Sequence, residues 1–315
     1  MKHLFFLLLS TLFSQFLLSQ ERYVDIITDS IEVATYTYAS KQGEDLMLDI
    51  YLPGNDYEEK RAAVIYVHGG GFRGGTRKAG EVFCKDLAKL GYVTASISYR
   101  LTRKGKPEGF GCDCTAIDKL NTFNAAVEDL QDATFFLIQN RQEFGIDPQK
   151  IIISGSSAGA EAVLNAAYLP PYCYGLDSGP VSYAGVISMA GAIPDLNKIY
   201  DESAIPSLLF HGTCDKLVPY ATAPHHYCNK EDSGYLILYG SFTIAQKLEQ
   251  LGVPYWLHTT CGGGHELAGT PKVKYMDEIK EFCYEYVVKG GGETRRTVIP
   301  GDQGQCNYQQ FNFCE

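Results

Sequence analysis

A serine flanked by glycines, between a predicted strand and a predicted helix, limits the folds open to this chain more than any other feature. Residues 155–159 read Gly-Ser-Ser-Ala-Gly and match the pattern G-x-S-x-G. The apolar run at 151–154 predicts a buried strand, and residues 160–168 (AEAVLNAAY) predict a helix. A sharp turn between such elements exposes the serine on strained backbone, and the glycines allow close packing. Ser157 is therefore the candidate nucleophile. Ser156 is the rival, but it occupies a variable position of the pattern.

The rest of the chain alternates between strand-like and helix-like segments. Apolar or β-rich runs predict strands at 46–52, 62–67, 92–99, 151–153, 186–189, 206–210 and 255–258. Apolar spacing and glycine stops predict helices at 79–90, 118–144, 160–168, 241–251 and 272–288. This alternation implies an α/β fold with a mostly parallel central sheet and helices on both faces. No linker interrupts residues 20–289, which we expect to form one domain.

Three polar stretches break this alternation, at 102–117, 168–183 and 220–239. Each carries glycine, proline or cysteine, and tyrosine is frequent in the last two. They are either surface loops held by disulfides or loops around a pocket. We favour pocket loops for the second and third stretches, because loops at strand ends carry sites in folds of this class.

The N-terminus predicts export. Residues 1–19 start with Lys2, continue as an apolar run and end at the small residue Ser19, which is the pattern of a cleaved signal peptide. A membrane anchor is the alternative, but the run is shorter than the roughly 20 apolar residues that a spanning helix needs. No later stretch is apolar and long enough to span a bilayer. We therefore expect a secreted or periplasmic protein.

Charge argues against a nucleic-acid partner. The chain has 27 lysines and arginines against 37 acidic residues, a net charge of −10, and removal of residues 1–19 takes away one further positive charge. A protein that binds the phosphate backbone concentrates basic residues in a stripe or patch, and no such stripe is present.

All ten cysteines follow residue 19, so in an oxidising compartment they predict a disulfide-stabilised fold. The competing idea is a metal site. Cys112 and Cys114 form the one tight pair, and the Cys-x₂-Cys spacing of zinc sites is absent, so we expect no metal. Residues 290–315 begin with three glycines and carry Cys306 and Cys314, which predicts a flexible joint and a tail stapled by disulfides.

A second glycine-rich segment follows the predicted strand at 62–67. Residues 68–72 read His-Gly-Gly-Gly-Phe. Three glycines let backbone N–H groups point at one spot, as the oxyanion of a tetrahedral intermediate requires. A phosphate-binding loop is the alternative, but neither G-x-x-x-x-G-K-[ST] nor G-x-G-x-x-G is present here. We therefore interpret 68–72 as an oxyanion loop.

A serine nucleophile needs a base and a group that orients the base. Asp215, in HGTCD at 211–215, and His265, in GGGH at 262–265, each follow a predicted strand after the serine, in the order serine, acid, histidine. We therefore predict Asp215 as the acid and His265 as the base. The alternatives are weaker because they lie within strands, in mid-loop or at unusual positions: His211, His258, His225, His226, Asp195 and Asp201.

These four motifs in this order resemble the α/β-hydrolase superfamily, and in particular the carboxylesterases similar to hormone-sensitive lipase and to feruloyl and acetyl xylan esterases. The resemblance covers roughly residues 33–289. It implies that the backbone N–H groups of Gly70, Gly71 and Ala158 form the oxyanion hole, and that Tyr99-Arg100 is a structural pair. Many lipase-like members have an acidic residue at the position of Ser156 and a long N-terminal cap that this chain lacks, so the acyl pocket cannot be copied from them.

Two disulfide hypotheses concern the loops of the site. The loops that carry Asp215 and His265 must approach each other, so we expect Cys214 to pair with Cys261. We also expect Cys84 to pair with Cys112 or Cys114 and so to hold the loop beside the oxyanion segment.

These features together predict a secreted serine carboxylesterase that needs no cofactor and acts through an acyl-enzyme. Its expected substrate is a small or polysaccharide-linked ester, such as an acetyl or feruloyl ester of plant polysaccharide. The alternatives are a short-chain lipase, a serine peptidase of the same fold, or a non-catalytic binding protein on a hydrolase scaffold.

Overall fold

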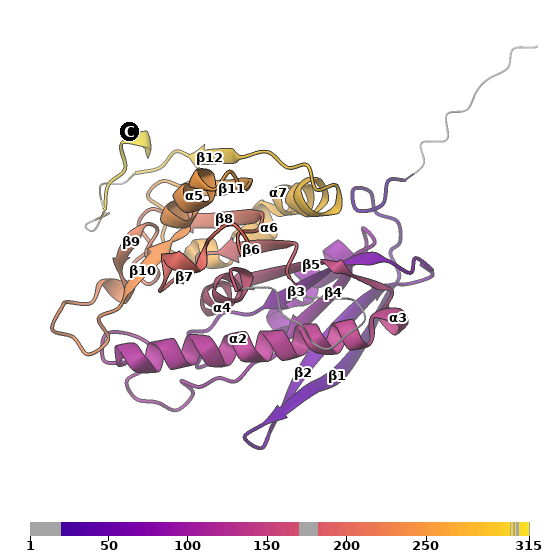
Figure 1. Ribbon diagram of the computed structural model, residues 1–315, viewed down its shortest axis with the longest axis horizontal. Coiled ribbons are helices and arrows are strands. Elements are labelled where there is room, and N and C mark those ends of the chain that lie inside the picture. The colour runs from indigo at the N-terminus through magenta and orange to yellow at the C-terminus, as the bar shows by residue number, and fades with distance from the viewer. Residues whose placement is uncertain (1–19, 170–181, 303, 305, 307–308, 315) are drawn as a thin grey trace, which may run out of the picture.

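A nine-stranded sheet runs through the computed structural model, which describes residues 20–169, 182–302, 304, 306 and 309–314 (Figure 1). The strand order is β1-β2-β4-β3-β5-β6-β8-β11-β12. The first two pairings, β1 with β2 and β2 with β4, are antiparallel, and every other pairing is parallel. The strands of this sheet are β1 Ile31–Lys41, β2 Glu44–Pro53, β3 Arg61–Val67, β4 Val93–Ile97, β5 Ile146–Ser156, β6 Gly185–Met189, β8 Ser207–Gly212, β11 Tyr255–Thr260 and β12 Arg295–Ile299. The predicted α/β class is confirmed.

Helices cover both faces of the sheet. The α-helices are α1 Glu81–Ala88, α2 Ala116–Gln139, α3 Arg141–Phe144, α4 Ala158–Ala167, α5 Ser241–Gln250, α6 Pro271–Lys274 and α7 Met276–Glu281. Alternate residues of the central strand β3 enter two separate apolar clusters: Ile65 and Val67 pack with α2, α4 and α5, whereas Val64 and Tyr66 pack with α1 and α7. Burial on both faces explains why these strands read as continuous apolar runs.

A small sheet and several short helices complete the fold. The small sheet has the order β7-β10-β9, with β7 at Ala192–Ile193, β9 at Thr222–Pro224 and β10 at Ile237–Gly240. A π-helical segment (η5) at Phe282–Val288 continues α7. The 3₁₀ helices are η1 Arg77–Gly80, η2 Leu196–Lys198, η3 His225–Tyr227, η4 His265–Ala268 and η6 Asn312–Cys314.

The predicted helix at 118–144 is divided in two at Asn140. Helix α2 begins after Thr115, whose side chain accepts a hydrogen bond from the Asp118 N–H at 3.2 Å. It ends where the Asn140 side chain donates to the Phe136 carbonyl at 2.8 Å, because a side-chain amide competes with the backbone for this acceptor. Helix α3 then ends at Gly145, whose φ of 61° suits glycine, as predicted.

Two strands of the nine-stranded sheet, and the three short strands of the small sheet, were not predicted. Strand β1 forms an antiparallel hairpin with β2 at one end of the sheet. At the other end, β12 pairs in parallel with β11, so the tail at 290–315 contributes a strand and is more than a stapled appendage. The tail crosses the top of the view in Figure 1.

The predicted signal peptide at 1–19, most of the loop at 168–183 and Cys173 lie outside the described residues. Within the described part of the chain, no helix combines the length and apolar character needed to cross a membrane.

Candidate active site

Ser157 lies on strained backbone between β5 and α4. Its φ of 52° and ψ of −122° are rare for a residue with a side chain, and it is the N-cap of α4. The glycines around it are required by packing. A Cβ on Gly155 would lie 2.2 Å from the Gly159 carbonyl oxygen, and one on Gly159 would lie 2.1 Å from the Val67 carbonyl oxygen. Close contact between β5, α4 and β3 therefore holds the serine at the tip of the turn.

The structure brings Ser157, His265 and Asp215 together at the carboxyl edge of the parallel strands. The Oγ atom of Ser157 lies 2.7 Å from Nε2 of His265, and Nδ1 of His265 lies 2.7 Å from Oδ2 of Asp215. Because an ionised carboxylate only accepts, His265 carries its proton on Nδ1, and its Nε2 is left to accept the serine proton. This is the arrangement that a serine nucleophile needs.

The carboxylate of Asp215 is buried and bonded on both oxygens. Its Oδ1 atom accepts hydrogen bonds from the N–H groups of Leu217 and Val218 at 2.9 and 3.0 Å. Burial opposes ionisation of Asp215, but hydrogen bonds from His211 and His265 outweigh it and lower the pKa of the carboxyl below its ordinary value. Asp215 is therefore ionised at neutral pH.

The competing histidines and aspartates hold other positions. His211 is buried beside Asp215, with Nδ1 2.9 Å from the Ser241 hydroxyl and Nε2 3.1 Å from the Val218 carbonyl oxygen. His258 is buried against Phe210. Asp195 caps the 3₁₀ helix η2 through its side chain.

The glycine loop at 68–72 packs directly on the serine. A Cβ on Gly69 would lie 2.8 Å from the Ser156 carbonyl oxygen, and Gly70 and Gly71 have φ values of 127° and 61°. Within the described residues, no hydrogen bond occupies the N–H group of Gly70 or Gly71. The Tyr99 hydroxyl donates to the His68 carbonyl oxygen at 2.8 Å, which anchors the start of the loop. Free N–H groups beside a nucleophile are what an oxyanion hole requires.

Known structures share this fold. A thermophilic esterase, Est2, from Thermogutta terrifontis, solved with propionate bound, aligns with a TM-score of 0.58 over 82% of this chain and 94% of that chain, at 20% identity. The BD-FAE family model matches residues 48–171, which include the glycine loop and the serine turn. The chain has the α/β-hydrolase fold.

Curated proteins that are similar to this chain include a lipase and an ethyl acetate hydrolase. Lipase 1 from Geotrichum candidum is 28% identical over 60% of this chain and 35% of its own length. Ethyl acetate hydrolase from Pseudomonas putida is 26% identical over 40% of this chain and 36% of its own length. The chain thus spans about a third of the length of these relatives.

A cavity of about 580 Å³ opens on Ser157 and His265. Its walls come from the glycine loop, the segment 107–111, helix α4 and the segment 217–226. Of the loops that the sequence singled out, 102–117 and 220–239 therefore both border the cavity. The lining includes Phe110 and Glu161, which the sequence did not single out, and His225, which it named only as a weaker candidate for the base. The sequence could have pointed to Glu161 alone, because Glu161 lies one helical turn after Ser157 on the predicted helix and therefore on the same side of it.

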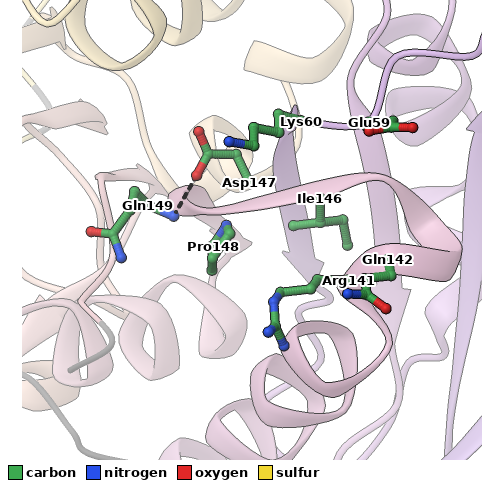
Figure 2. Close-up of a pocket in the computed structure, with 8 residues that line it drawn as sticks. All are labelled: Glu59, Lys60, Arg141, Gln142, Ile146, Asp147, Pro148 and Gln149. Atoms are coloured by element: carbon green, nitrogen blue, oxygen red, sulfur yellow. Dashed lines mark hydrogen bonds between the residues drawn. The ribbon is translucent and has the colours of Figure 1, made fainter. Parts of the chain in front are cut away.

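A second hollow, of about 660 Å³, lies at the opposite edge of the sheet (Figure 2). It is bordered by Lys60, just before β3, by helix α3 and by the start of β5 at Ile146. The hydrogen bond drawn there joins the Gln149 N–H to Asp147 at 2.9 Å. The hollow contains no member of the Ser157 cluster, so it is not the candidate active site.

The expected Cys214–Cys261 disulfide is wrong, although the two loops do meet. Cys214 pairs with Cys306, and Cys261 pairs with Cys314, with Cα atoms 4.9 and 5.7 Å apart. The loops approach through backbone hydrogen bonds instead, such as that from the Cys214 N–H to the Gly263 carbonyl at 2.8 Å. The tail that continues from β12 then brings one cysteine to each loop.

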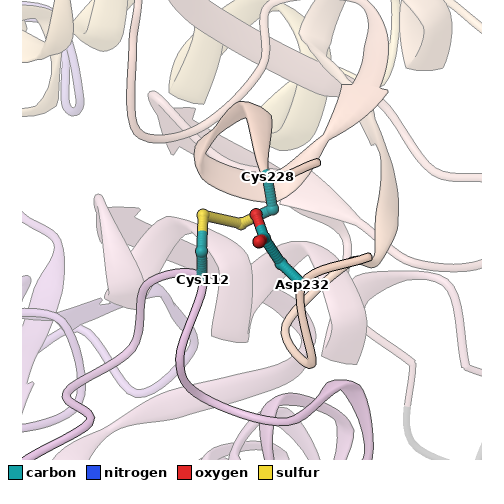
Figure 3. A group of neighbouring side chains, drawn as sticks. All are labelled: Cys112, Cys228 and Asp232. Atoms are coloured by element: carbon teal, nitrogen blue, oxygen red, sulfur yellow. A yellow bond between two sulfur atoms is a disulfide. The ribbon is translucent and has the colours of Figure 1, made fainter. Parts of the chain in front are cut away.

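The expected pairing of Cys84 is also wrong. Cys84 is buried in the cluster beneath α1, whereas Cys114 is buried in the cluster on the other face of the sheet, so the sheet separates them. Cys112 pairs with Cys228 instead and joins two walls of the cavity (Figure 3). The carboxylate of Asp232 lies beside this disulfide. Because both sulfurs are bonded to each other, this group is not a metal site in the oxidised protein.

Proposed function

We propose that this protein is a serine esterase that cleaves carboxylic esters through an acyl-enzyme. The observation that carries the proposal is the pair of 2.7 Å contacts that links Ser157 to His265 and His265 to Asp215. The N–H groups of Gly70, Gly71 and Ala158 lie around the same serine and serve as oxyanion donors in this mechanism.

In the first half of the reaction, His265 accepts the Ser157 proton as Oγ attacks the ester carbonyl carbon. The carbonyl oxygen becomes negative and is held by the loop N–H groups. Collapse of this intermediate breaks the bond to the alcohol oxygen, and His265 gives its proton to the departing alcohol. In the second half, water loses a proton to His265 and attacks the acyl carbon. The bond between this carbon and Oγ of Ser157 then breaks, His265 returns its proton to Oγ, and the acid is released. Asp215 stays ionised throughout and stabilises protonated His265.

Acetyl or feruloyl esters of plant polysaccharide are the substrates that we propose. The cavity of about 580 Å³ has the size of sites that take ligands as large as an aromatic acyl group. The predicted leader at 1–19 supports contact with such polymers outside the cytoplasm, and disulfides persist in oxidising compartments. A short-chain lipase remains the alternative within the same chemistry.

Labelling with a fluorophosphonate tests the nucleophile. We expect the wild type and Ser156→Ala to be labelled and to hydrolyse p-nitrophenyl acetate, and Ser157→Ala to do neither. Ser156 is a matched control because its hydroxyl is buried and lies 2.9 Å from the Tyr66 hydroxyl. Circular dichroism confirms that each variant is folded. Labelling of folded Ser157→Ala would refute the assignment, and a folded, unlabelled wild type would favour a binding protein.

Two further experiments test substrate and export. Release of acetate from acetylated xylan and of ferulate from feruloylated arabinoxylan is compared with hydrolysis of p-nitrophenyl butyrate and of tributyrin. Hydrolysis of the butyrate esters without release from either polysaccharide would favour the short-chain lipase. N-terminal sequencing of protein expressed with residues 1–19 should find a mature chain that begins near Gln20.

A further inference from the structure

Glu161 and His225 form a polar pair in the lining of the cavity that opens on Ser157. Glu161 is 2% exposed and His225 is 1% exposed. They come from two different walls, helix α4 and the 3₁₀ helix η3, and His225 Nε2 lies 3.4 Å from Glu161 Oε1. None of the proposed catalytic steps uses either residue.

Each residue has a buried polar atom without a hydrogen-bond partner among the described residues. These atoms are Oε1 of Glu161 and Nδ1 of His225. A buried polar group without a hydrogen-bond partner destabilises the folded state, so such groups need a reason to persist. The other unpartnered buried side-chain atoms of the described chain belong to residues outside this cavity lining. Glu161 and His225 thus bring two unpartnered polar atoms to the lining of the cavity that contains Ser157, which favours a site for a ligand there.

Neighbouring contacts hold the pair in place. The His225 N–H donates to the Leu236 carbonyl at 2.8 Å, and the ring of Phe110 meets the His225 ring edge-on at 5.2 Å between centroids. The Cys112–Cys228 disulfide fixes the chain three residues after His225 (Figure 3). The site is therefore preformed, with an aromatic ring beside the two polar groups.

Burial favours the neutral form of both groups. Burial raises the pKa of Glu161 well above its ordinary value, although Lys119 opposes this rise. Burial also lowers the pKa of His225 well below its ordinary value, and His226 and Lys119 add to that effect. A protonated carboxyl group donates one hydrogen bond and accepts others, and a neutral imidazole donates one and accepts one.

We propose that Glu161 and His225 form a subsite that binds a hydroxyl group of the ester substrate, on either its acyl or its alcohol side. A hydroxyl group donates one hydrogen bond and accepts another, which matches a neutral acid beside a neutral imidazole. An anionic or cationic group would have to be desolvated against two neutral partners, which is costly. The inference rests on the proposed esterase function and adds a rule for substrate choice.

Matched esters that differ by one hydroxyl group test the subsite. On the acyl side, methyl butyrate is compared with methyl 3-hydroxybutyrate, and methyl cinnamate with methyl 4-hydroxycinnamate. On the alcohol side, propyl acetate is compared with 3-hydroxypropyl acetate. We expect the wild type to prefer the hydroxylated member of at least one pair by about tenfold or more in kcat/KM, because a site built to bind a hydroxyl group rejects the analogue that lacks it. The pair that shows the preference identifies the side of the ester that enters the subsite.

Two substitutions at Glu161 separate its hydrogen bonding from its bulk. Glu161→Leu removes both donor and acceptor, and we expect it to reduce the hydroxyl preference about tenfold. Glu161→Gln keeps a donor and an acceptor in nearly the same shape and should keep most of the preference. Glu59→Leu, in the hollow of Figure 2, is the matched control and should retain the wild-type preference. Melting curves show whether each variant is folded.

The outcomes distinguish this inference from the proposed function. Hydrolysis of the plain esters without a hydroxyl preference in any pair would overturn the subsite and leave the esterase intact. An unchanged preference in folded Glu161→Leu would do the same. Failure of the wild type to hydrolyse any ester would overturn the proposed function, and the subsite with it.

Discussion

The Nε2 atom of His211 lies 3.4 Å from Oδ2 of Asp215, the oxygen that also accepts the hydrogen bond of His265. His211 is fully buried, and its other contacts are the Ser241 hydroxyl and the Val218 carbonyl. One carboxylate oxygen thus faces two histidines with different surroundings. His265 reaches the serine, whereas His211 positions the acid.

Replacement of His211 tests this positioning role. In His211→Phe the ring volume is kept, but the polar contacts with Asp215, Ser241 and Val218 are lost. We expect kcat for p-nitrophenyl acetate to fall roughly tenfold with little change in KM, because a small misplacement of a catalytic group costs rate. His211→Gln can retain a donor toward Asp215 and should recover part of the rate. A wild-type kcat in His211→Phe would show that the contact has no catalytic consequence.

The shape of the glycine loop predicts a large effect of one added methyl group. In Gly70→Ala the new Cβ would lie 2.2 Å from the Gly74 carbonyl oxygen, at a φ of 127° that side chains rarely adopt. The loop must shift, so we expect kcat to fall about 100-fold, as when an oxyanion donor is lost. Gly74→Ala meets no atom within 4 Å and should retain activity. Equal activities of the two variants, measured with p-nitrophenyl acetate, would contradict this account of the loop.

The tail disulfides should support both stability and rate. We replace Cys214, Cys261, Cys306 and Cys314 by serine together, which prevents new pairings among them. A disulfide contributes about 2–4 kcal/mol, so the melting temperature should fall by roughly 5 °C or more. We also expect a lower kcat, because the loops of Asp215 and His265 lose their anchor.

A reducing agent provides the control for the tail. Dithiothreitol should destabilise the wild type more than the four-serine variant. Cys283→Ala removes a buried cysteine that has no bridge, so it should respond to dithiothreitol like the wild type. An unchanged melting temperature and kcat in the four-serine variant would show that β12 alone holds the tail.

His258 predicts a pH-dependent loss of stability. Burial lowers its pKa to about 4, and its two ring nitrogens have no hydrogen-bond partner among the described residues. Because its pKa in the folded state lies below the unfolded value of about 6.5, protons bind the unfolded state more readily. The contribution of His258 to stability therefore falls as the pH drops from about 6.5 to 4 and is constant above about 7.5.

His258→Phe removes this dependence while keeping the ring between Phe210 and Tyr275. We expect the melting temperature of His258→Phe to exceed that of the wild type by a larger amount at pH 5 than at pH 8. Each kcal/mol in the free energy of unfolding corresponds to about 2–4 °C in melting temperature. Melting curves across this range measure the difference. If the difference in melting temperature between the variant and the wild type were equal at both pH values, unfolding would not change the pKa of His258.

The central strands and the order of the motifs could be predicted from local sequence. Strand β3 is buried on both faces and therefore reads as a continuous apolar run, and the glycines at 155 and 159 are dictated by contacts with adjacent backbone. The edge strands β1 and β12 carry no such signal, because exposure lets polar residues such as Arg295 stand in a strand.

The disulfides and the polar subsite could not be predicted in this way. The pairing of Cys214 depends on where β12 docks, which is a long-range contact without a local pattern. His225 is 68 residues from Ser157, and its loop gave no periodic signal that it would be buried beside α4. The sequence placed His225 in the middle of a loop; in the structure it begins the short helix η3 and is buried in the lining of the cavity.

The attachment of β12 and its cysteines also imposes an order on biosynthesis. The chain is made from its N-terminus, so the loops of Asp215 and His265 leave the ribosome before Cys306 and Cys314. Their two anchoring bridges cannot close until those later residues have been synthesised and have met an oxidant. The serine and its oxyanion loop can fold first, and the bridges at Cys214 and Cys261 form last.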